Sequence, residues 1–271
     1  MTLNPIDDLF GRLRLAKAKA FIPFIAAGDP SPSATTHLII ELDKAGCHLI
    51  ELGFPFSDPI ADGPVIQASY TRALDRGVKV DDVMSCVEKA KPVTAPLVGM
   101  ASYTLVYRRG PAQFVDRAIT AGFSGLIVPD LPAEEAAEFA KLCADRNFRN
   151  IMLVTPTTPP ARAEKIVRLS TGFVYCVSIA GVTGERDRLP DELLVQLLQL
   201  RTMTNLPLCV GFGVGKPEQV RVLRDVADGV IVGSAIVRRL ENAGPANSGA
   251  VVAEIRELVK RLMDALNPPK R

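Results

Sequence analysis

The chain has few histidines, no paired cysteines and no long apolar segment, and each of these absences excludes a class of protein. Among 271 residues there are only two histidines, His37 and His48, and no serine or cysteine motif lies near either of them. The five cysteines are scattered without a C-x-x-C pair, which indicates neither a zinc site nor a disulfide framework, and we interpret them as reduced core thiols. We expect no metal site, so the chemistry must depend on other side chains.

Targeting and charge signals are missing as well. The sequence contains no run of about 18 apolar residues, as a membrane-spanning helix would require. Asp7 and Asp8 lie where a signal peptide would have its apolar core. The formal net charge of +2 provides no broad basic field for nucleic acid or anionic lipid. We therefore expect a soluble, cytoplasmic protein that binds neither nucleic acid nor a membrane.

What the chain does contain is a repeated alternation of short apolar segments and helical patterns. Nearly continuous apolar character is typical of parallel strands that helices cover. Eight βα units fit a closed (β/α)8 TIM barrel of about 250 residues, and no linker marks a second domain. The eight segments are FIPFIAA from Phe21, HLIELG from His48, PLVGM from Pro96, GLIVPD from Gly125, NIMLVT from Asn150, FVYCVS from Phe173, LPLCVGFG from Leu206 and GVIVGS from Gly229.

The sequence therefore predicts one α/β domain over residues 1–271, a TIM barrel with an additional helix near Ile6 to Leu15 before the first strand. A last helix is predicted over AVVAEIRELVKRLMDAL, and the long interval after the second strand predicts an enlarged loop there. An open, doubly wound sheet is the alternative, because periodicity does not show whether a sheet closes.

The enlarged loop begins with the segment ELGFPFSDPIADGP, which holds three carboxylates. Strand alternation places Glu51 on the same face as Cys47 and Leu49, pointing into the mouth of the barrel, where loss of hydration would raise its pKa. Asp62 follows on a loop stiffened by proline and glycine, and two carboxylates in different environments can divide acid and base work. Taken singly, Glu51 also fits a strand-end glutamate that reaches water or a lysine, and Asp62 and Asp58 also fit turn-forming residues.

A phosphate site is indicated at the ends of the seventh and eighth apolar segments, where barrels of this type commonly bind phosphate. Gly211, Gly213 and Gly215 end one segment, and Gly233 and Ser234 end the other. Glycines allow close backbone approach, and free N–H groups at helix starts attract phosphate. The alternative is that these glycines only permit tight turns.

After the sixth apolar segment, SIAGVTGERDR suits a lid that closes over a substrate, or else an ordinary solvated connection. Tyr175, in that segment, fits a buried core tyrosine on sequence grounds.

These motifs together resemble the tryptophan synthase alpha chain family. The segment ELGFPFSDPIADGP followed by VIQ resembles the family signature. The other matching segments, in the same order as in the family, are FIPFIAAGDP, VPDLPAEE, PTTPPAR, AGVTGERD, GFGVGKPEQV and GSAIV. The resemblance implies a (β/α)8 barrel that cleaves indole-3-glycerol phosphate to indole and glyceraldehyde 3-phosphate without cofactor or metal. It also implies a pyridoxal-phosphate beta chain as partner in an αββα heterotetramer.

The resemblance also implies roles for particular residues. Glu51 resembles the acid/base that handles the glycerol hydroxyl and the proton bound for indole C3, and Asp62 resembles the acceptor of the indole N–H. The remaining matches are Tyr175 in the pocket, Gly184, Gly213, Gly233 and Ser234 at the phosphate, Phe24 and Phe212 at the indole, Thr183 in the lid, and Asp58 with PDLP at the beta-chain surface.

One loop departs from the family pattern. After the third apolar segment the family commonly has a tyrosine followed two positions later by an asparagine, whereas this chain reads Ser102-Tyr103-Thr104. Two alternatives to the lyase remain at this point: a protein retained mainly as an allosteric partner of a beta chain, and another phosphosugar lyase or isomerase on the same barrel.

Overall fold

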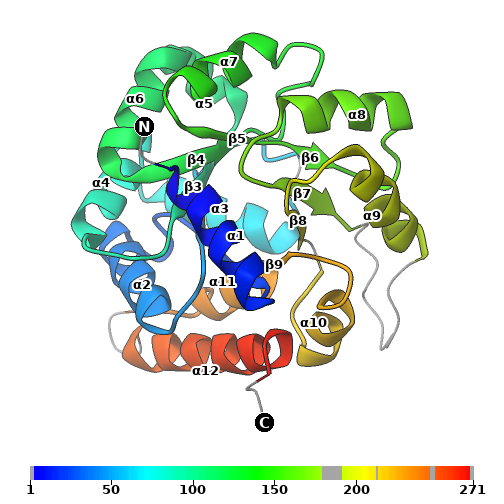
Figure 1. The fold of residues 1–271 in the computed structure, drawn as a ribbon. Helices are drawn as coiled ribbons and strands as arrows, with labels where there is room; N and C mark the ends of the chain where they lie inside the picture. Colours follow the sequence, from blue (N-terminus) through cyan, green and yellow to red (C-terminus); the bar gives the residue numbers. More distant parts are fainter. Residues whose placement is uncertain (1–2, 61, 179–190, 212, 245–247, 269–271) are drawn as a thin grey trace.

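A computed structural model describes residues 3–60, 62–178, 191–211, 213–244 and 248–268. Its strands form a single parallel sheet with the order β5-β4-β3-β2-β1-β9-β8-β7-β6 (Figure 1). The strands are β1 Ala20–Ala26, β2 Ile50–Gly53, β3 Leu97–Met100, β4 Phe123–Ile127, β5 Arg149–Ile151, β6 Leu153–Val154, β7 Val174–Val177, β8 Leu208–Gly211 and β9 Gly229–Val232.

The sheet closes into a barrel. Its two terminal strands, β5 and β6, are separated in the chain only by Met152, so the fifth predicted segment carries both ends of the strand order. The remaining strands follow chain order around the ring, with β1 pairing in parallel with both β2 and β9. The predicted (β/α)8 barrel is confirmed, and the open doubly wound alternative is wrong.

Helices surround the strands. They are α1 Pro5–Ala16, α2 Pro32–Lys44, α3 Pro64–Asp75, α4 Val80–Ala90, α5 Tyr103–Arg109, α6 Pro111–Ala121, α7 Ala137–Asp145, α8 Pro160–Leu169, α9 Asp191–Met203, α10 Pro217–Leu223, α11 Ser234–Leu240 and α12 Ser248–Leu266. Within the described ranges, none of these helices is both long enough and apolar enough to span a membrane.

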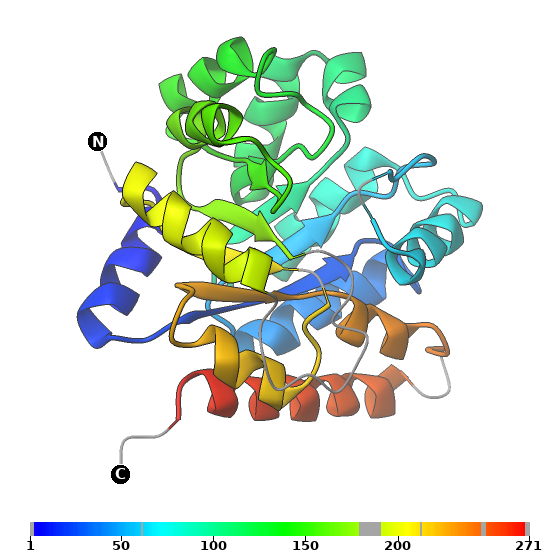
Figure 2. The same ribbon diagram turned by 90° about the vertical axis from the view of Figure 1, so that its right-hand side faces the viewer.

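The additional N-terminal helix closes one end of the barrel. Proline at its start and the Asn4 side chain, which accepts a hydrogen bond from the Ile6 N–H, begin α1. Ile6 and Phe10 belong to the core inside the barrel, and the ring of Phe10 lies 5.8 Å from that of Phe173. Figure 2 shows α1 at one end of the barrel and the chain after β2 at the other. An active site must therefore open at the end opposite α1.

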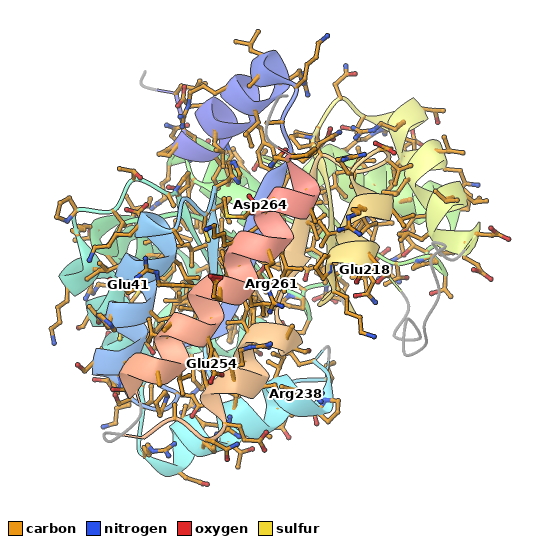
Figure 3. All side chains as sticks on the ribbon, turned by 90° about the horizontal axis from the view of Figure 1, so that it is seen from below. Glu41, Glu218, Arg238, Glu254, Arg261 and Asp264 are labelled. Atoms are coloured by element: carbon orange, nitrogen blue, oxygen red, sulfur yellow. The ribbon has the colours of Figure 1, made fainter. Side chains whose placement is uncertain are left out.

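The last helix covers the outside. Buried residues of α12 recur every three or four positions, including Ile255, Leu258 and Leu262, and α12 packs against α2, α10 and α11. Arg256 adds an ion pair with Glu41 of α2 at 3.2 Å. Figure 3 shows α12 lying across the neighbouring helices on this side of the molecule. The predicted last helix is confirmed.

Two hydrophobic layers follow from strand alternation. In β2, Ile50 and Leu52 belong to the outer core between strands and helices, whereas Leu49, just before the strand, belongs to the core inside the barrel. Cys47 belongs to the outer core, so its predicted place on the face of Leu49 and Glu51 is wrong. The reason is that β2 begins only at Ile50, and Cys47 lies in the turn before it, where alternation does not apply.

The enlarged interval between β2 and β3 contains a loop and two helices. Helix α4 packs against α2 and α6 in the outer ring, whereas α3 packs against β1 and α11. The additional helix α3 thus lies beside the ends of β1 and β9.

All five cysteines are buried and free, as predicted for core thiols. Burial raises the pKa of the Cys47, Cys143 and Cys176 thiols to about 12.

Candidate active site

Glu51 is a carboxylate buried inside the barrel. It lies in β2, opposite Phe24 of β1 and Val98 of β3, and its side chain is completely shielded from solvent. Neither carboxylate oxygen has a hydrogen-bond partner within the described part of the chain. Burial, and after it the negative charge of Asp62, raises the pKa of Glu51 from 4.5 to about 8. The reading of Glu51 as a strand-end glutamate that reaches water or a lysine is therefore wrong.

Asp62 lies on the loop that leads into α3. Its backbone helps to form this loop, because its N–H donates to the Pro59 carbonyl at 3.1 Å and its carbonyl accepts from Gln67 at 2.8 Å. Burial also raises the pKa of the Asp62 carboxyl, from 3.8 to about 6. The charge of Asp62 acts on Glu51, so the two carboxylates lie in one region of the structure. The pKa of Glu51, about 8, is nevertheless higher than that of Asp62, about 6.

Two tyrosines lie within the field of these carboxylates. Tyr175 of β7 is 4% exposed, and a Cβ added to Gly211 of β8 would lie only 2.3 Å from its hydroxyl. Burial raises the pKa of Tyr175 well above its usual value, and the charges of Glu51 and Asp62 add to the shift. Tyr70 of α3 has the same combination of burial with the charges of Asp62 and Glu51.

Tyr70 is the residue that the sequence analysis missed. An aromatic residue inside an amphipathic helix is usually core, so its type and spacing carried no functional signal. The available signal was its position, eight residues after Asp62 in the helix that the same loop begins.

Phe24 forms a wall between neighbouring strands. It is 5% exposed and belongs to the core inside the barrel. Its ring lies against Gly53 at the end of β2, where an added Cβ would come within 2.6 Å, and against Gly233 after β9, at 3.4 Å. Phe212, predicted as a second wall, lies outside the described residues.

The two glycine-containing loops lie next to each other. Gly213, after β8, has a φ of +74°, a left-handed conformation that glycine adopts without strain. A Cβ on Gly215 would lie 3.0 Å from that of Ala235, so this loop contacts the first turn of α11. Gly233 and Ser234 begin α11, whose first N–H groups have no acceptor within the helix. Thr183 and Gly184 lie outside the described residues.

Two cavities open at this end of the barrel. The larger, of about 690 Å³, has walls from the ends of β4, β6 and β7, including Val128, Leu153 and Val177. Its size is typical of a small-molecule site, about 300–1,000 Å³. The smaller cavity is lined by Asp62 and Tyr70, among others. Pro129 and Asp130 line both cavities, so the two adjoin.

The departing loop is fixed to the segment after β4. The hydroxyl of Ser102 donates to Asp130 at 2.6 Å, and the N–H of Tyr103 donates to the same carboxylate at 2.7 Å. Tyr103 also lies 6.0 Å from Tyr107 and 6.3 Å from Phe139, measured between ring centroids. Ser102 and Tyr103 thus fix the start of α5 to the segment after β4.

Comparison with known proteins gives one consistent family. The family model described as tryptophan synthase alpha chain matches residues 10–267. A tryptophan synthase alpha chain of Rhodopirellula baltica is 48% identical over 245 residues, which is 89% of this chain and 88% of that protein. The crystal structure of tryptophan synthase subunit alpha from Legionella pneumophila str. Paris has a TM-score of 0.88 at 33% identity, covering 98% of this chain and 99% of the other. A crystal structure of tryptophan synthase from M. tuberculosis in an aminoacrylate-bound form has a TM-score of 0.85 at 29% identity, covering 97% of this chain and 100% of the other.

Proposed function

Because this chain belongs to the tryptophan synthase alpha chain family, we propose that Glu51 and Asp62 perform its acid–base chemistry. The reaction is the cleavage of indole-3-glycerol phosphate in tryptophan biosynthesis, and the chain is an indole-3-glycerol-phosphate lyase. The observation that carries the proposal is the buried Glu51 carboxyl, whose two oxygens have no hydrogen-bond partner among the described residues. A buried polar group in this state lowers stability, and functional sites are where such groups are retained.

The cleavage requires two proton movements, and Glu51 can perform both. The bond between indole C3 and the first glycerol carbon breaks, so a proton must reach C3 and another must leave the adjacent hydroxyl. With a pKa of about 8, Glu51 holds a proton at neutral pH that it can deliver to C3. The carboxylate formed in this way accepts the hydroxyl proton as the bond breaks. Indole and glyceraldehyde 3-phosphate result, and Glu51 ends the cycle protonated.

Asp62 supplies the complementary charge. With a pKa of about 6, its carboxyl is ionised at neutral pH. We assign it to the indole N–H, where it accepts a hydrogen bond and stabilises the positive charge that develops on the ring when C3 is protonated. Tyr175, buried beside Gly211 within the field of both carboxylates, completes the catalytic group.

The remaining substrate contacts follow from the two loops and the aromatic wall. Gly213, Gly233 and Ser234 would bind the phosphate through N–H groups at the start of α11 and in the adjacent loop. Phe24, between Gly53 and Gly233, would contact the indole ring. Gly184 at the phosphate, Phe212 at the indole and Thr183 in the lid stay predictions, since they lie outside the described residues.

A beta chain is the proposed protein partner, in an αββα heterotetramer. Family membership supports this assembly. Asp58 is exposed on the loop after β2. Asp130 is partly exposed and lines both cavities, so both residues can contact a partner at the end of the barrel that carries the site.

The direct test is Glu51→Gln, which keeps the size of the side chain and removes the titratable proton. Loss of one general acid–base group is expected to lower kcat by about 10²–10⁴-fold, measured as indole released from indole-3-glycerol phosphate. Glu41→Gln is the matched control, because Glu41 is also buried but lies in α2 with ion pairs to Lys44 and Arg256. Normal turnover in Glu51→Gln would refute the proposed mechanism.

The two pKa values also predict the pH dependence. Asp62 must be ionised and Glu51 protonated in the free enzyme, so kcat/KM is expected to be bell-shaped with limbs near pH 6 and pH 8. The acid limb should be absent in Asp62→Asn, whatever activity that variant retains. A flat profile between pH 5 and 9 in the unmodified chain would contradict the assignment.

A further inference from the structure

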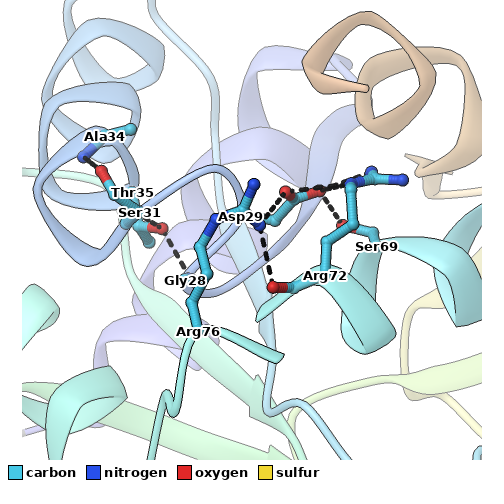
Figure 4. A network of polar contacts seen from close by, with 8 residues as sticks. All are labelled: Gly28, Asp29, Ser31, Ala34, Thr35, Ser69, Arg72 and Arg76. Atoms are coloured by element: carbon cyan, nitrogen blue, oxygen red, sulfur yellow. Dashed lines mark hydrogen bonds and ion pairs between the residues drawn. The ribbon is translucent and has the colours of Figure 1, made fainter. Parts of the chain in front are cut away.

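Helix α3 is fixed to the end of β1 by a buried carboxylate that the mechanism does not use. Asp29 is 2% exposed and accepts hydrogen bonds from the Ser69 hydroxyl at 2.5 Å and from the Arg72 guanidinium at 2.6 Å (Figure 4). The Nε of Arg72 approaches both oxygens, at 3.1 and 3.2 Å, and Arg76 adds a longer ion pair of 3.7 Å. This network sets the position and rotation of α3 relative to the barrel.

Tyr70 follows Ser69 in that helix, and the fixed rotation places its phenol at the end of β2. The residue is 3% exposed and belongs to the core inside the barrel. A Cβ added to Gly53 would lie 2.2 Å from the Tyr70 hydroxyl, so only glycine leaves room for this contact. Gly53 comes two residues after Glu51 on the same strand. A helix outside the barrel thus brings a hydroxyl to the strand that carries the acid.

The hydroxyl of Tyr70 is a donor still free to act. Among the described residues it makes no hydrogen bond, and Tyr70 lines the same cavity as Asp62. Burial raises the pKa of the phenol well above its usual value, and the charges of Asp62 and Glu51 add to the shift in that order. The phenol therefore stays protonated across the working pH range and can act only as a neutral hydrogen-bonding group.

We propose that Tyr70 is a positioning residue whose hydroxyl donates a hydrogen bond to the Asp62 carboxylate and holds it toward the indole N–H. The inference rests on the proposed role of Asp62. It adds a residue from α3 to a site that is otherwise built from strands, loops and the start of α11, and it gives the Asp29 network a function in placing that residue.

The charges around Asp62 decide what loss of this hydroxyl would do. Glu51 faces it from β2, Tyr175 faces the same carboxylates from β7, and Asp58 and Asp130 line the shared cavity. Burial opposes ionisation of Asp62, whereas a hydrogen bond to the charged form favours it. Removal of the donor should therefore raise the pKa of Asp62 relative to its pKa in the unmodified chain.

The test is Tyr70→Phe in the full chain, assayed with indole-3-glycerol phosphate from pH 5 to 9. The expected result is a fall in kcat of about tenfold, the scale of one hydrogen bond to a charged group. The acid limb of kcat/KM should also move upward by about one pH unit. Tyr107→Phe is the matched control, because it makes the same change on a tyrosine that is 69% exposed in α5. Incorporation of 3-fluorotyrosine at position 70 provides a more acidic phenol of nearly the same size, and should move the acid limb in the opposite direction.

Two results would overturn the inference. One is a Tyr70→Phe profile that matches the profile of Tyr107→Phe. The other is a loss of activity with the acid limb unmoved in both the phenylalanine and the fluorotyrosine proteins, since this would mean that Tyr70 only packs. Asp62→Asn separates this failure from that of the proposed function: if it is inactive while Tyr70→Phe is silent, only the role of Tyr70 is wrong, and if it is fully active, the role of Asp62 is wrong as well.

Discussion

Asp29 follows β1 and Glu51 lies in the neighbouring strand β2, and both are buried, but their surroundings are opposite. Asp29 is bound by Ser69 and Arg72, with Arg76 nearby. Glu51 accepts no hydrogen bond from any residue that the structure describes. Complete pairing makes the first carboxylate a link between β1 and α3, whereas the absence of partners leaves the second free to hold and release a proton.

This contrast shows that burial alone does not identify a catalytic acid. A buried charge with matched donors stabilises an arrangement, and its removal leaves those donors unpaired. A buried carboxyl without donors destabilises its ionised form, which is what raises the pKa of Glu51. The presence or absence of hydrogen-bond donors therefore distinguishes the structural acid, Asp29, from the reactive one, Glu51.

The largest expected effect on stability is that of removing the paired acid. Asp29→Ala leaves Ser69 and Arg72 without their acceptor and should lower the free energy of unfolding by about 3–5 kcal/mol. Urea denaturation of the purified chain measures this change. Asp145→Ala is the control, because Asp145 is 56% exposed in its pair with Lys141, and should cost at most about 1 kcal/mol. An equal loss of unfolding free energy in the two variants would mean that Asp29 stabilises the fold no more than a surface acid does.

An effect that depends on pH is expected for the unpaired acid. Between about pH 4.5 and pH 8 the unfolded chain has released the Glu51 proton while the folded chain keeps it, so stability falls as the pH rises. The fall amounts to at most about 1.4 kcal/mol for each pH unit. Glu51→Gln lacks this loss, so it should gain stability relative to the unmodified chain across this window and keep a constant advantage above pH 8.

Glu41→Gln sharpens this comparison. The hydrogen bond from Lys44 lowers the pKa of Glu41, with smaller contributions from the charges of Lys44 and Arg256. Its ionised form therefore stabilises the fold at neutral pH, and that contribution is lost as the pH falls through its folded pKa. The glutamine variant should lose stability at neutral pH where Glu51→Gln gains it. Thermal unfolding at a series of pH values distinguishes the two, and the same sign for both would contradict the contrast.

The apolar pattern of the sequence predicted the strands well, because a strand that helices bury must be apolar along most of its length. The eight predicted apolar segments form the strands of the barrel. Alternation of side chains correctly placed Glu51 inside the barrel and Ile50 on its outer face. The same rule failed at Cys47, which precedes the strand. Alternation depends on regular strand geometry and gives no information about a turn.

The partners of the buried groups were not predictable in this way. Asp29, in the sequence GDP, has the pattern of a turn residue, and its partner Arg72 is 43 positions away. Tyr70 has the pattern of a core residue of α3. Nothing local indicates that one face of this helix binds Asp29 while Tyr70 contacts Gly53.

The order of residues along the chain was enough to determine the repeated βα pattern, the acids at the end of the second strand and the glycines at the ends of the last two, since these depend on local periodicity and residue type. Closure of the ring, the different surroundings of Asp29, Glu51 and Asp62, and the approach of Tyr70 were decided only in three dimensions. The reason is that pKa values and hydrogen bonds depend on which groups surround a side chain, and here those groups come from segments far apart in the chain.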